Sequence, residues 1–240
     1  MERLEGINSV LSALEGEREI NKILIMEGKT GRLVDRIIST ARERQIPVVT
    51  LNRQRFESMA QSAYAQGVMA EAKAYDYAQV EDIMQLAAQK GEEPFIVVLD
   101  GLEDPQNLGS IIRTAECAGV HGVIIPKHRA AGVTAAVARA SAGALEHMLV
   151  AQVTNMAQTL TELKAKGCWV IGADMDGESV WGQGKLPTPA VVVIGGEGKG
   201  LHRLIKEKCD VTVRIPMGGH TGSLNASVSA ALMIYEVLKG

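Results

Sequence analysis

The sequence predicts an α/β protein in which a domain built on a parallel sheet follows a smaller α/β domain. From Phe95 onward, β-branched runs of strand length alternate with amphipathic helical stretches, which is the pattern of a parallel sheet covered by helices on both faces. Before about residue 75 the same alternation occurs on a smaller scale. Glycine-rich loops follow the last two strands. The 240 residues suffice for one large domain or two modest ones.

Composition excludes several classes of protein. Apolar residues make up 46% of the chain and charged residues 22%, which is ordinary for a soluble globular protein and excludes a disordered one. No run approaches the roughly 18 apolar residues of a membrane-spanning helix, and the N-terminal segment MERLEGINSV lacks a signal-peptide core. We therefore expect a cytoplasmic protein without membrane association. Cys117, Cys168 and Cys209 are odd in number and lack metal-site spacing, so buried free thiols are expected.

Residues 1–75 are predicted to form the smaller domain. Asn8 or Ser9 is expected to cap its first helix, and Pro47 favours the start of a strand or a sheet edge. The expected elements are a helix with Val10, Leu11 and Leu14, a strand at 23–26, a helix with Leu33, Ile37 and Ala41, a strand at 46–51, a helix with Phe56 and Met59, and a strand at 67–72.

A local excess of basic residues lies inside this smaller domain. The net charge of −3 by itself argues against a nucleic-acid partner. Between Lys29 and Arg55, however, two acidic residues stand against seven basic ones: Lys29, Arg32, Arg36, Arg42, Arg44, Arg53 and Arg55. These side chains would bind a phosphate backbone if they shared one face, whereas a solvated helix face is the alternative.

Residues 76–92 are predicted as a linker and residues 93–240 as the parallel-sheet domain. The linker contains a helix with Val80, Ile83 and Ala87 whose sequence does not indicate on which domain it packs. The expected elements of the larger domain are strands at 95–99, 122–125, 148–153, 168–173, 191–194 and 211–215 and helices at 108–118, 133–140 and 156–166.

Two glycine-rich loops follow the strands at 191–194 and 211–215. In parallel sheets ligands bind beyond the carboxyl ends of the strands, and glycines let the main chain approach a ligand closely. The first loop is no dinucleotide fingerprint, because Arg203 stands where the third glycine belongs. It is no Walker loop either, because Gly200 follows Lys199 in place of Ser or Thr. The loops predict a small-molecule site, with turns and caps that bind nothing as the alternative.

Three segments resemble the motifs of the SpoU/TrmH family of RNA ribose 2′-O-methyltransferases. The first is LDGLEDPQNLGSIIRTAECAG, which supplies Asn107, Gly109 and Arg113. The second is IGGEGKGL and the third is IPMGGHTGSLNASVSAAL, so that all three occur in the family's order within residues 99–240. The resemblance implies a SPOUT domain with a deep trefoil knot, an L30e-like RNA-binding domain at residues 1–75, and a homodimer with its sites at the interface.

The resemblance also implies roles for ten residues, with S-adenosylmethionine as the cofactor and no metal. The expected cofactor-binding residues, acting chiefly through their backbone, are Gly195, Gly196, Ile215, Met217 and Leu224. The expected catalytic residues are Arg113, Asn107, Glu197, Ser223 and Asn225.

Arg113 is expected to activate the 2′-hydroxyl. A guanidinium titrates above about 12, so it is a poor base but a good partner for a phosphate or a developing alkoxide; proton abstraction by Arg113 stays open. Without the motif, Arg113 would be read as a surface arginine and Asn107 as a helix cap. Ser223 or Asn225 would likewise be read as the cap of the last helix.

The RNA is expected to be rRNA. A chain with this N-terminal extension most resembles family members that methylate a guanosine ribose in the peptidyl-transferase region of 23S rRNA. A tRNA or another rRNA site, including the adenosine target of the thiostrepton-resistance enzymes, is the alternative. A non-catalytic RNA-binding assembly factor and a nucleotide-dependent oxidoreductase are the hypotheses from other classes.

The loop after the strand at 122–125 contains Lys127, His128 and Arg129. These side chains are candidates for contacts with RNA phosphates; a solvated loop is the alternative.

Overall fold

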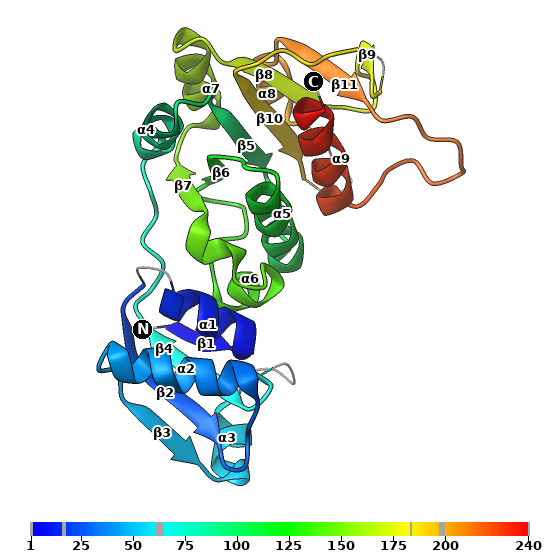
Figure 1. Ribbon diagram of the computed structural model, residues 1–240. Coiled ribbons are helices and arrows are strands. Elements are labelled where there is room, and N and C mark those ends of the chain that lie inside the picture. Colours follow the sequence, from blue (N-terminus) through cyan, green and yellow to red (C-terminus); the bar gives the residue numbers. More distant parts are fainter. Residues whose placement is uncertain (1, 16–17, 61–64, 183, 197–199, 240) are drawn as a thin grey trace. The chain divides into compact units, whose positions relative to one another are not determined.

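The computed structural model describes residues 2–15, 18–60, 65–182, 184–196 and 200–239 (Figure 1). Their contacts divide the chain into two compact units. The N-terminal unit consists of Met1–Asp76 and Val133–His147, and the C-terminal unit of Tyr77–Gly132 and Met148–Gly240. Among the described residues, the N-terminal unit has a four-stranded sheet and the C-terminal unit a seven-stranded one.

The sheet of the N-terminal unit is mixed. Its spatial order is β1 (Glu2–Glu5), β4 (Val68–Ala72), β2 (Ile20–Met26) and β3 (Val48–Leu51). β2 runs parallel to β3 and antiparallel to β4, which is also antiparallel to β1. The sequence did not predict β1, because its four residues ERLE contain only one apolar side chain. Pairing with β4 decides its conformation, and Leu4 is fully buried there.

In its first segment this unit has the described helices α1 (Ile7–Glu15), α2 (Arg32–Glu43) and α3 (Arg53–Met59). α1 begins directly after Gly6, so Asn8 and Ser9 lie inside the helix and the predicted cap is wrong. α2 buries Val34, Ile37 and Ala41, whereas Leu33 is 42% exposed. At about 100° per residue, Leu33 lies on the flank of this face, so the apolar repeat that predicted the helix does not coincide with its buried stripe.

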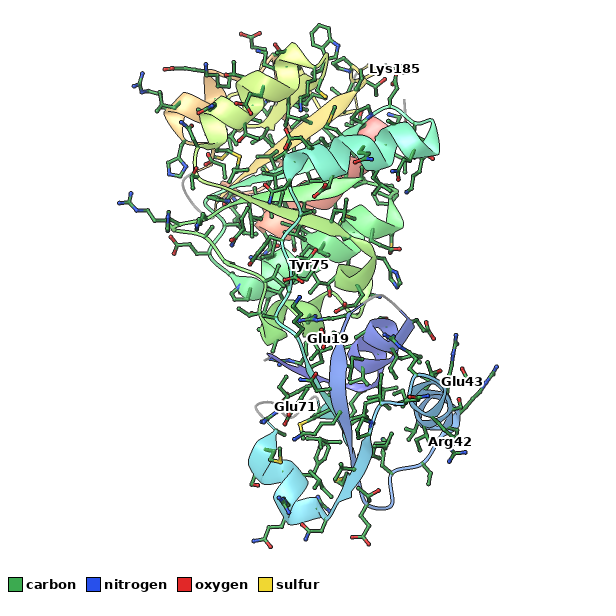
Figure 2. The ribbon with its side chains drawn as sticks, turned by 90° about the vertical axis from the view of Figure 1, so that its left-hand side faces the viewer. Glu19, Arg42, Glu43, Glu71, Tyr75 and Lys185 are labelled. Carbon is green, nitrogen blue, oxygen red and sulfur yellow. The ribbon has the colours of Figure 1, made fainter. Side chains whose placement is uncertain are left out.

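Most of the basic residues noted between Lys29 and Arg55 are exposed on the N-terminal unit. Figure 2 shows Arg42 projecting outward from α2 beside Glu43. Arg36 pairs with Glu15 at 2.7 Å and Arg53 with Glu57 at 2.7 Å, and all four side chains are more than one third exposed. Exposed pairs of this kind contribute little stability, so these arginines remain accessible to a polyanion.

Residues 133–147 pack within the N-terminal unit, although the sequence placed them in the domain at 93–240. Its α6 (Ala135–Ala140) contacts β1, and a 3₁₀ turn, η2 (Ala144–His147), contacts α1. Arg18 and Glu146 form an ion pair at 2.8 Å with side chains only 6% and 7% exposed. The apolar face of this stretch is covered by residues far away in sequence, which a local pattern does not reveal.

The C-terminal unit has a parallel sheet, as predicted. Its spatial order is β7-β6-β5-β10-β8-β11-β9, and each pair of neighbouring strands is parallel. The strands are β5 (Phe95–Asp100), β6 (Gly122–Pro126), β7 (Leu149–Val153), β8 (Trp169–Ala173), β9 (Ser179–Val180), β10 (Ala190–Gly195) and β11 (Val211–Arg214). The short β9 was not predicted, since two residues form no periodic pattern.

Helices cover both faces of this sheet (Figure 1). They are α4 (Val80–Lys90), α5 (Pro105–Cys117), α7 (Met156–Ala165), α8 (Arg203–Lys206) and α9 (Ala226–Leu238). α4, α7 and α8 contribute Ile83, Leu160 and Ile205 to one buried cluster, whereas α5 and α9 pack on each other on the opposite face. α4, which lies in the expected linker, is therefore part of the unit's core. None of the described helices is long and apolar enough to cross a membrane.

The order of the strands changes direction at β5. β6 and β7 lie successively on one side of β5, while β10, β8 and β11 lie on the other. Such a switch point leaves a crevice at the carboxyl ends of the strands, where ligands of parallel α/β proteins bind. Strand order alone does not define a knot, so the trefoil knot stays a prediction.

The three cysteines differ in exposure. Cys117, at the end of α5, is exposed, which corrects the expectation of buried thiols, while Cys168 is buried. Cys209 is partly buried, and burial raises the pKa of its thiol to about 11. None of the three forms a disulfide.

Candidate active site

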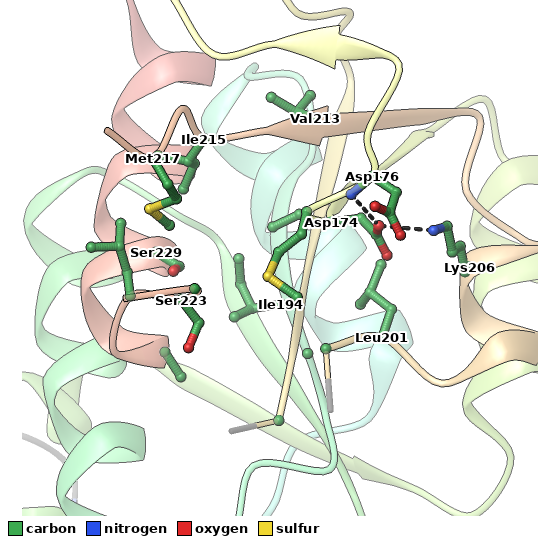
Figure 3. Close-up of a pocket in the computed structure, with 18 of the residues that line it drawn as sticks. Asp174, Asp176, Ile194, Leu201, Lys206, Val213, Ile215, Met217, Ser223 and Ser229 are labelled. Carbon is green, nitrogen blue, oxygen red and sulfur yellow. Dashed lines mark hydrogen bonds and ion pairs between the residues drawn. The ribbon is translucent and has the colours of Figure 1, made fainter. Parts of the chain in front are cut away.

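A cavity of about 670 Å³ lies at the carboxyl ends of β10, β8 and β11 (Figure 3). Ile194, Leu201 and Val213 contribute apolar walls, and Ser223 and Ser229 add hydroxyls near α9. Small-molecule sites typically occupy about 300–1,000 Å³ and combine apolar walls with a few polar groups. The cavity therefore has the size and character of a site for a small organic ligand.

All five residues expected to bind the cofactor line this cavity. Gly195 and Gly196 come from the end of β10, while Ile215, Met217 and Leu224 come from the segment between β11 and α9. The two segments meet because β10 and β11 flank β8 in the sheet. Figure 3 shows Ile215 and Met217 across the cavity from Leu201. The structure thus brings the second and third motifs together, while the binding role of these residues stays a prediction.

Close backbone packing explains why glycines occupy the last position of β10 and the position after it. A Cβ atom on Gly195 would lie 2.2 Å from the carbonyl carbon of Gly200, and one on Gly196 would lie 2.6 Å from the carbonyl oxygen of Gly101. Gly200 also donates its N–H to the Gly196 carbonyl at 3.2 Å. The loop after β10 is therefore closed on itself and on the loop after β5. The sequence interpretation considered approach of the main chain to a ligand, or turns and caps, but not the packing of this loop on neighbouring backbone.

An ion pair that sequence reasoning missed stands at the edge of the cavity. Lys206 Nζ lies 2.8 Å from Asp174 Oδ1, which also accepts the N–H of Asp176 at 2.9 Å (Figure 3). The hydrogen bond to Asp174 raises the pKa of Lys206. The sequence did contain an indication of Asp174, because this residue directly follows the predicted strand at 168–173 and so lies at the ligand-binding edge of the sheet.

Asn225 connects the third motif to the first. Its Oδ1 accepts the N–H of Ser227 at 2.9 Å and of Val228 at 3.4 Å, so Asn225, not Ser223, caps α9. Its Nδ2 donates to Oδ1 of Asn107 at 3.0 Å across 118 positions of sequence. Two asparagines of the expected catalytic set are therefore directly bonded.

Asn107 is not the cap of its own helix. α5 begins at Pro105, earlier than predicted, and the carboxylate of Asp104 caps it by accepting the N–H of Gln106 at 2.9 Å. Asn107 lies in the first turn and is only 6% exposed. Its place beside Asn225 thus depends on the packing of α5 against α9.

The other expected catalytic residues are placed differently. Ser223 lines the cavity. Arg113 lies on the exposed side of α5, about 120° around the helix from Asn107. It does not line this cavity, and it forms no hydrogen bond or ion pair with any residue that the structure describes. Glu197 lies outside the described residues.

Within the described part of the chain, no three His, Cys, Asp or Glu side chains group as a metal site would require.

Comparison with known proteins gives two family matches. The sequence profile of the SpoU rRNA Methylase family matches residues 94–235, and that of the RNA 2′-O ribose methyltransferase substrate binding region matches residues 3–78. YacO of Bacillus subtilis (strain 168), which carries the name of a TrmH family tRNA/rRNA methyltransferase, is 44% identical over 234 residues. The match covers 98% of this chain and 94% of YacO. A protein of Staphylococcus haemolyticus with the same family name is also 44% identical, at the same coverage.

Solved structures share the fold over nearly the whole chain. The SpoU methyltransferase AviRb from Streptomyces viridochromogenes, in complex with its cofactor AdoMet, matches with a TM-score of 0.82 at 24% identity. The alignment covers 99% of this chain and 89% of AviRb. An AdoMet-bound rRNA methyltransferase from Sinorhizobium meliloti has a TM-score of 0.82 at 23% identity, covering 99% and 87% of the two chains. Such identities show a common fold.

Proposed function

Because the chain belongs to the SpoU rRNA methylase family, we propose that it transfers a methyl group from S-adenosylmethionine to a ribose 2′-hydroxyl of RNA. The observation that carries this proposal is the meeting of all five expected cofactor residues in one cavity at the carboxyl ends of β10, β8 and β11. The hydrogen bond between Asn107 and Asn225, which ties the first motif to the third beside that cavity, supports it further.

The residues of the cavity fit this cofactor. The backbone around Gly195, Ile215 and Leu224 offers hydrogen-bonding groups between apolar walls, as an adenosine requires. Asp174 and Lys206 offer opposite charges to the ammonium and carboxylate of the methionine part. We therefore assign the five motif residues to the nucleoside and the Asp174–Lys206 pair to the amino-acid end.

When bound, S-adenosylmethionine supplies the methyl carbon that the 2′-oxygen attacks, and the electron pair of the broken carbon–sulfur bond stays on sulfur. The chain must align the hydroxyl for this displacement and stabilise the charge that develops as the hydroxyl loses its proton. We assign that stabilisation to Arg113, whose guanidinium matches an alkoxide or phosphate, and the proton passes to water. Asn107 and Asn225 position the start of α9, next to Ser223.

A homodimer would explain the exposed position of Arg113. Since Arg113 does not line the cavity of its own chain, we propose that a second copy supplies it across the interface that the family resemblance implies. α9, which starts beside the cavity, exposes Val228, Tyr235 and Leu238 by about half each. Apolar side chains exposed along one helix suit such an interface.

We propose rRNA as the acceptor, in particular a guanosine in the peptidyl-transferase region of 23S rRNA; a tRNA or another rRNA site is the alternative. The match of residues 3–78 to a substrate-binding region and the exposed basic side chains of the N-terminal unit support RNA binding there. Mapping 2′-O-methyl groups in total RNA from a strain that lacks the protein identifies the site. If no ribose methyl group disappears, the proposed reaction is wrong.

Substitution of Arg113 tests the chemistry. Arg113→Ala and Arg113→Lys should both slow single-turnover methyl transfer at saturating RNA and cofactor by a factor of hundreds, or about 3–4 kcal/mol. Lysine keeps the charge but not the planar pair of donors. Cofactor affinity should not change, and Arg53→Lys on α3 should keep the full rate as the matched control. Retention of more than about a tenth of the rate in Arg113→Ala would contradict the assignment.

A further inference from the structure

A second cavity, of about 550 Å³, opens at the same edge of the sheet. Asp100 and Glu103 line it from the end of β5 and the loop that follows, and His128 and Arg129 from the loop after β6. Gly196 and Gly200 line both cavities. The loop after β10 is therefore a shared border, so that ligands in the two cavities would meet there.

The second cavity differs from the first in its chemistry. Its lining combines acidic Asp100 and Glu103 with Arg129 and two histidines, His128 and His202. Asp100, only 6% exposed, accepts the N–H of His202 at 2.7 Å and contacts its ring Nδ1 at 3.0 Å. The first bond holds the backbone of His202, and the second orients its imidazole ring. A wall of donors and acceptors suits a polar, planar ligand better than the adenosine and methionine of the cofactor.

The loop that presents Arg129 holds it in an unusual backbone conformation. Arg129 has φ +55°, in the left-handed region that residues other than glycine rarely adopt. Hydrogen bonds fasten the loop on both sides, from Lys127 N–H to the Val153 carbonyl at 2.9 Å and from Ala131 N–H to the Leu102 carbonyl at 2.7 Å. Strain that the surroundings impose in this way is characteristic of functional sites.

We propose that this second cavity binds the RNA nucleotide that receives the methyl group, with its base a guanine held between Glu103 and Arg129. Guanine presents the O6 and N7 acceptors that an arginine fork contacts in pairs. Its N1–H and N2–H donors lie on the neighbouring Watson–Crick edge and match the carboxylate of Glu103. Adenine lacks the N1–H donor. The ribose then lies at the border formed by Gly196 and Gly200, beside the cofactor cavity. This inference rests on the proposed function.

The test uses the full chain with total RNA from a deletion strain as the methyl acceptor. Arg129→Gly and Glu103→Gln should each lower kcat/KM for RNA by about tenfold or more, the value of one good base contact. Calorimetry should give an unchanged dissociation constant for S-adenosylhomocysteine, because neither side chain lines the first cavity. Arg129→Gly should melt no lower than the wild type, since glycine adopts positive φ without strain.

Two matched controls separate base binding from backbone and charge effects. Gln66→Gly also replaces an exposed residue at positive φ, here +52°, but in the N-terminal unit and outside the basic stretch 29–55. Glu93→Gln also removes an exposed carboxylate, but at the amino end of β5, the opposite edge of the sheet. Both should keep the wild-type kcat/KM.

The outcomes distinguish the inference from the function on which it rests. Nucleoside analysis of the methylated RNA should show 2′-O-methylguanosine; another methylated nucleoside would overturn the base assignment and leave the methyl transfer intact. Loss of activity in Arg129→Gly but not in Glu103→Gln would mean that the cavity contacts only phosphate, and would overturn the nucleotide site. Wild-type activity in both Arg129→Gly and Glu103→Gln would also overturn the nucleotide site. Absence of methyl transfer by the wild type would refute the proposed function itself.

Discussion

At Gly195, a hydrogen atom is the only side chain that the surrounding backbone admits. The loop after β10 returns so closely that the main chain of Gly200 occupies the space of a Cβ atom. The same loop borders both cavities. One residue thus maintains the shape of the proposed cofactor site without contributing a functional group.

Gly195→Ala should disrupt this loop. A Cβ atom 2.2 Å from a backbone carbon forces the main chain to move, so we expect a loss of about 1–3 kcal/mol in unfolding free energy from overpacking. Affinity for S-adenosylmethionine should fall more than tenfold, a cost above about 1.4 kcal/mol. Calorimetry and thermal unfolding measure both.

Gly218→Ala is the matched control for this substitution. It lies in the third motif, where a Cβ atom would meet nothing within 4 Å, so stability should stay within about 0.5 kcal/mol of wild type. Wild-type cofactor affinity in Gly195→Ala would show that the loop is not a wall of the cofactor site.

Asn225 shows a different combination of roles. It caps α9 and also holds Asn107 of the first motif. Losing a cap of this type costs about 1 kcal/mol by itself. An alanine at this position therefore changes the structure around the cavity and the proposed catalytic set at the same time, and its effect cannot be assigned to chemistry alone.

At the scale of elements, α2 shows how small an angular difference separates core from surface. Val34, Ile37 and Ala41 form the buried stripe, while Leu33 lies at its flank. Leu33 also fits a helical repeat with Ile37 and Ala41, which is why the sequence pattern selected it. Neighbouring basic residues make the exposed side of this helix part of the proposed RNA-binding surface.

Two alanine substitutions in α2 test this orientation. Ile37→Ala removes a fully buried side chain and should cost about 2–5 kcal/mol in unfolding free energy. Leu33→Ala, of similar size but 42% exposed, should cost less than about 1 kcal/mol. Calorimetric unfolding of the two variants compares them directly. Equal costs would show that Leu33 faces the core.

At the scale of the whole molecule, the chain enters the N-terminal unit twice. Residues 133–147 leave the C-terminal unit between β6 and β7 and pack with β1 and α1. Val137 and Leu145 are buried there, and Glu146 pairs with Arg18. The N-terminal unit therefore depends on a segment from the middle of the sequence.

Deletion of residues 1–75 should consequently be harmful beyond the loss of RNA binding. It would expose the apolar face of α6 and leave Glu146 without Arg18, so we expect a lower melting temperature and aggregation of the truncated chain. Replacing 133–147 in that chain by a Gly/Ser linker of equal length should restore solubility and S-adenosylmethionine binding. If the simple deletion is as stable as the linker version, α6 does not need the N-terminal unit.

The sequence by itself determined the class of fold and the neighbourhood of the site. Runs of β-branched residues such as 191–194 specify buried parallel strands through local composition, and loops that follow such strands must meet at one edge of the sheet. For this reason the loops after 191–194 and 211–215 could be assigned to one ligand site without knowledge of their contacts, whereas the individual roles of Gly195, Ile215 and Leu224 were implied by the family resemblance.

Only the tertiary structure decided features that depend on partners distant in the chain. It selected Asn225 over Ser223 as the cap of α9, moved residues 133–147 into the N-terminal unit, and paired Asp174 with Lys206. It also brought Glu103 and Arg129, from the loops after β5 and β6, to the lining of one second cavity. Periodicity reports only how one segment alternates between core and solvent, whereas each of these contacts depends on which other segment supplies the opposing surface.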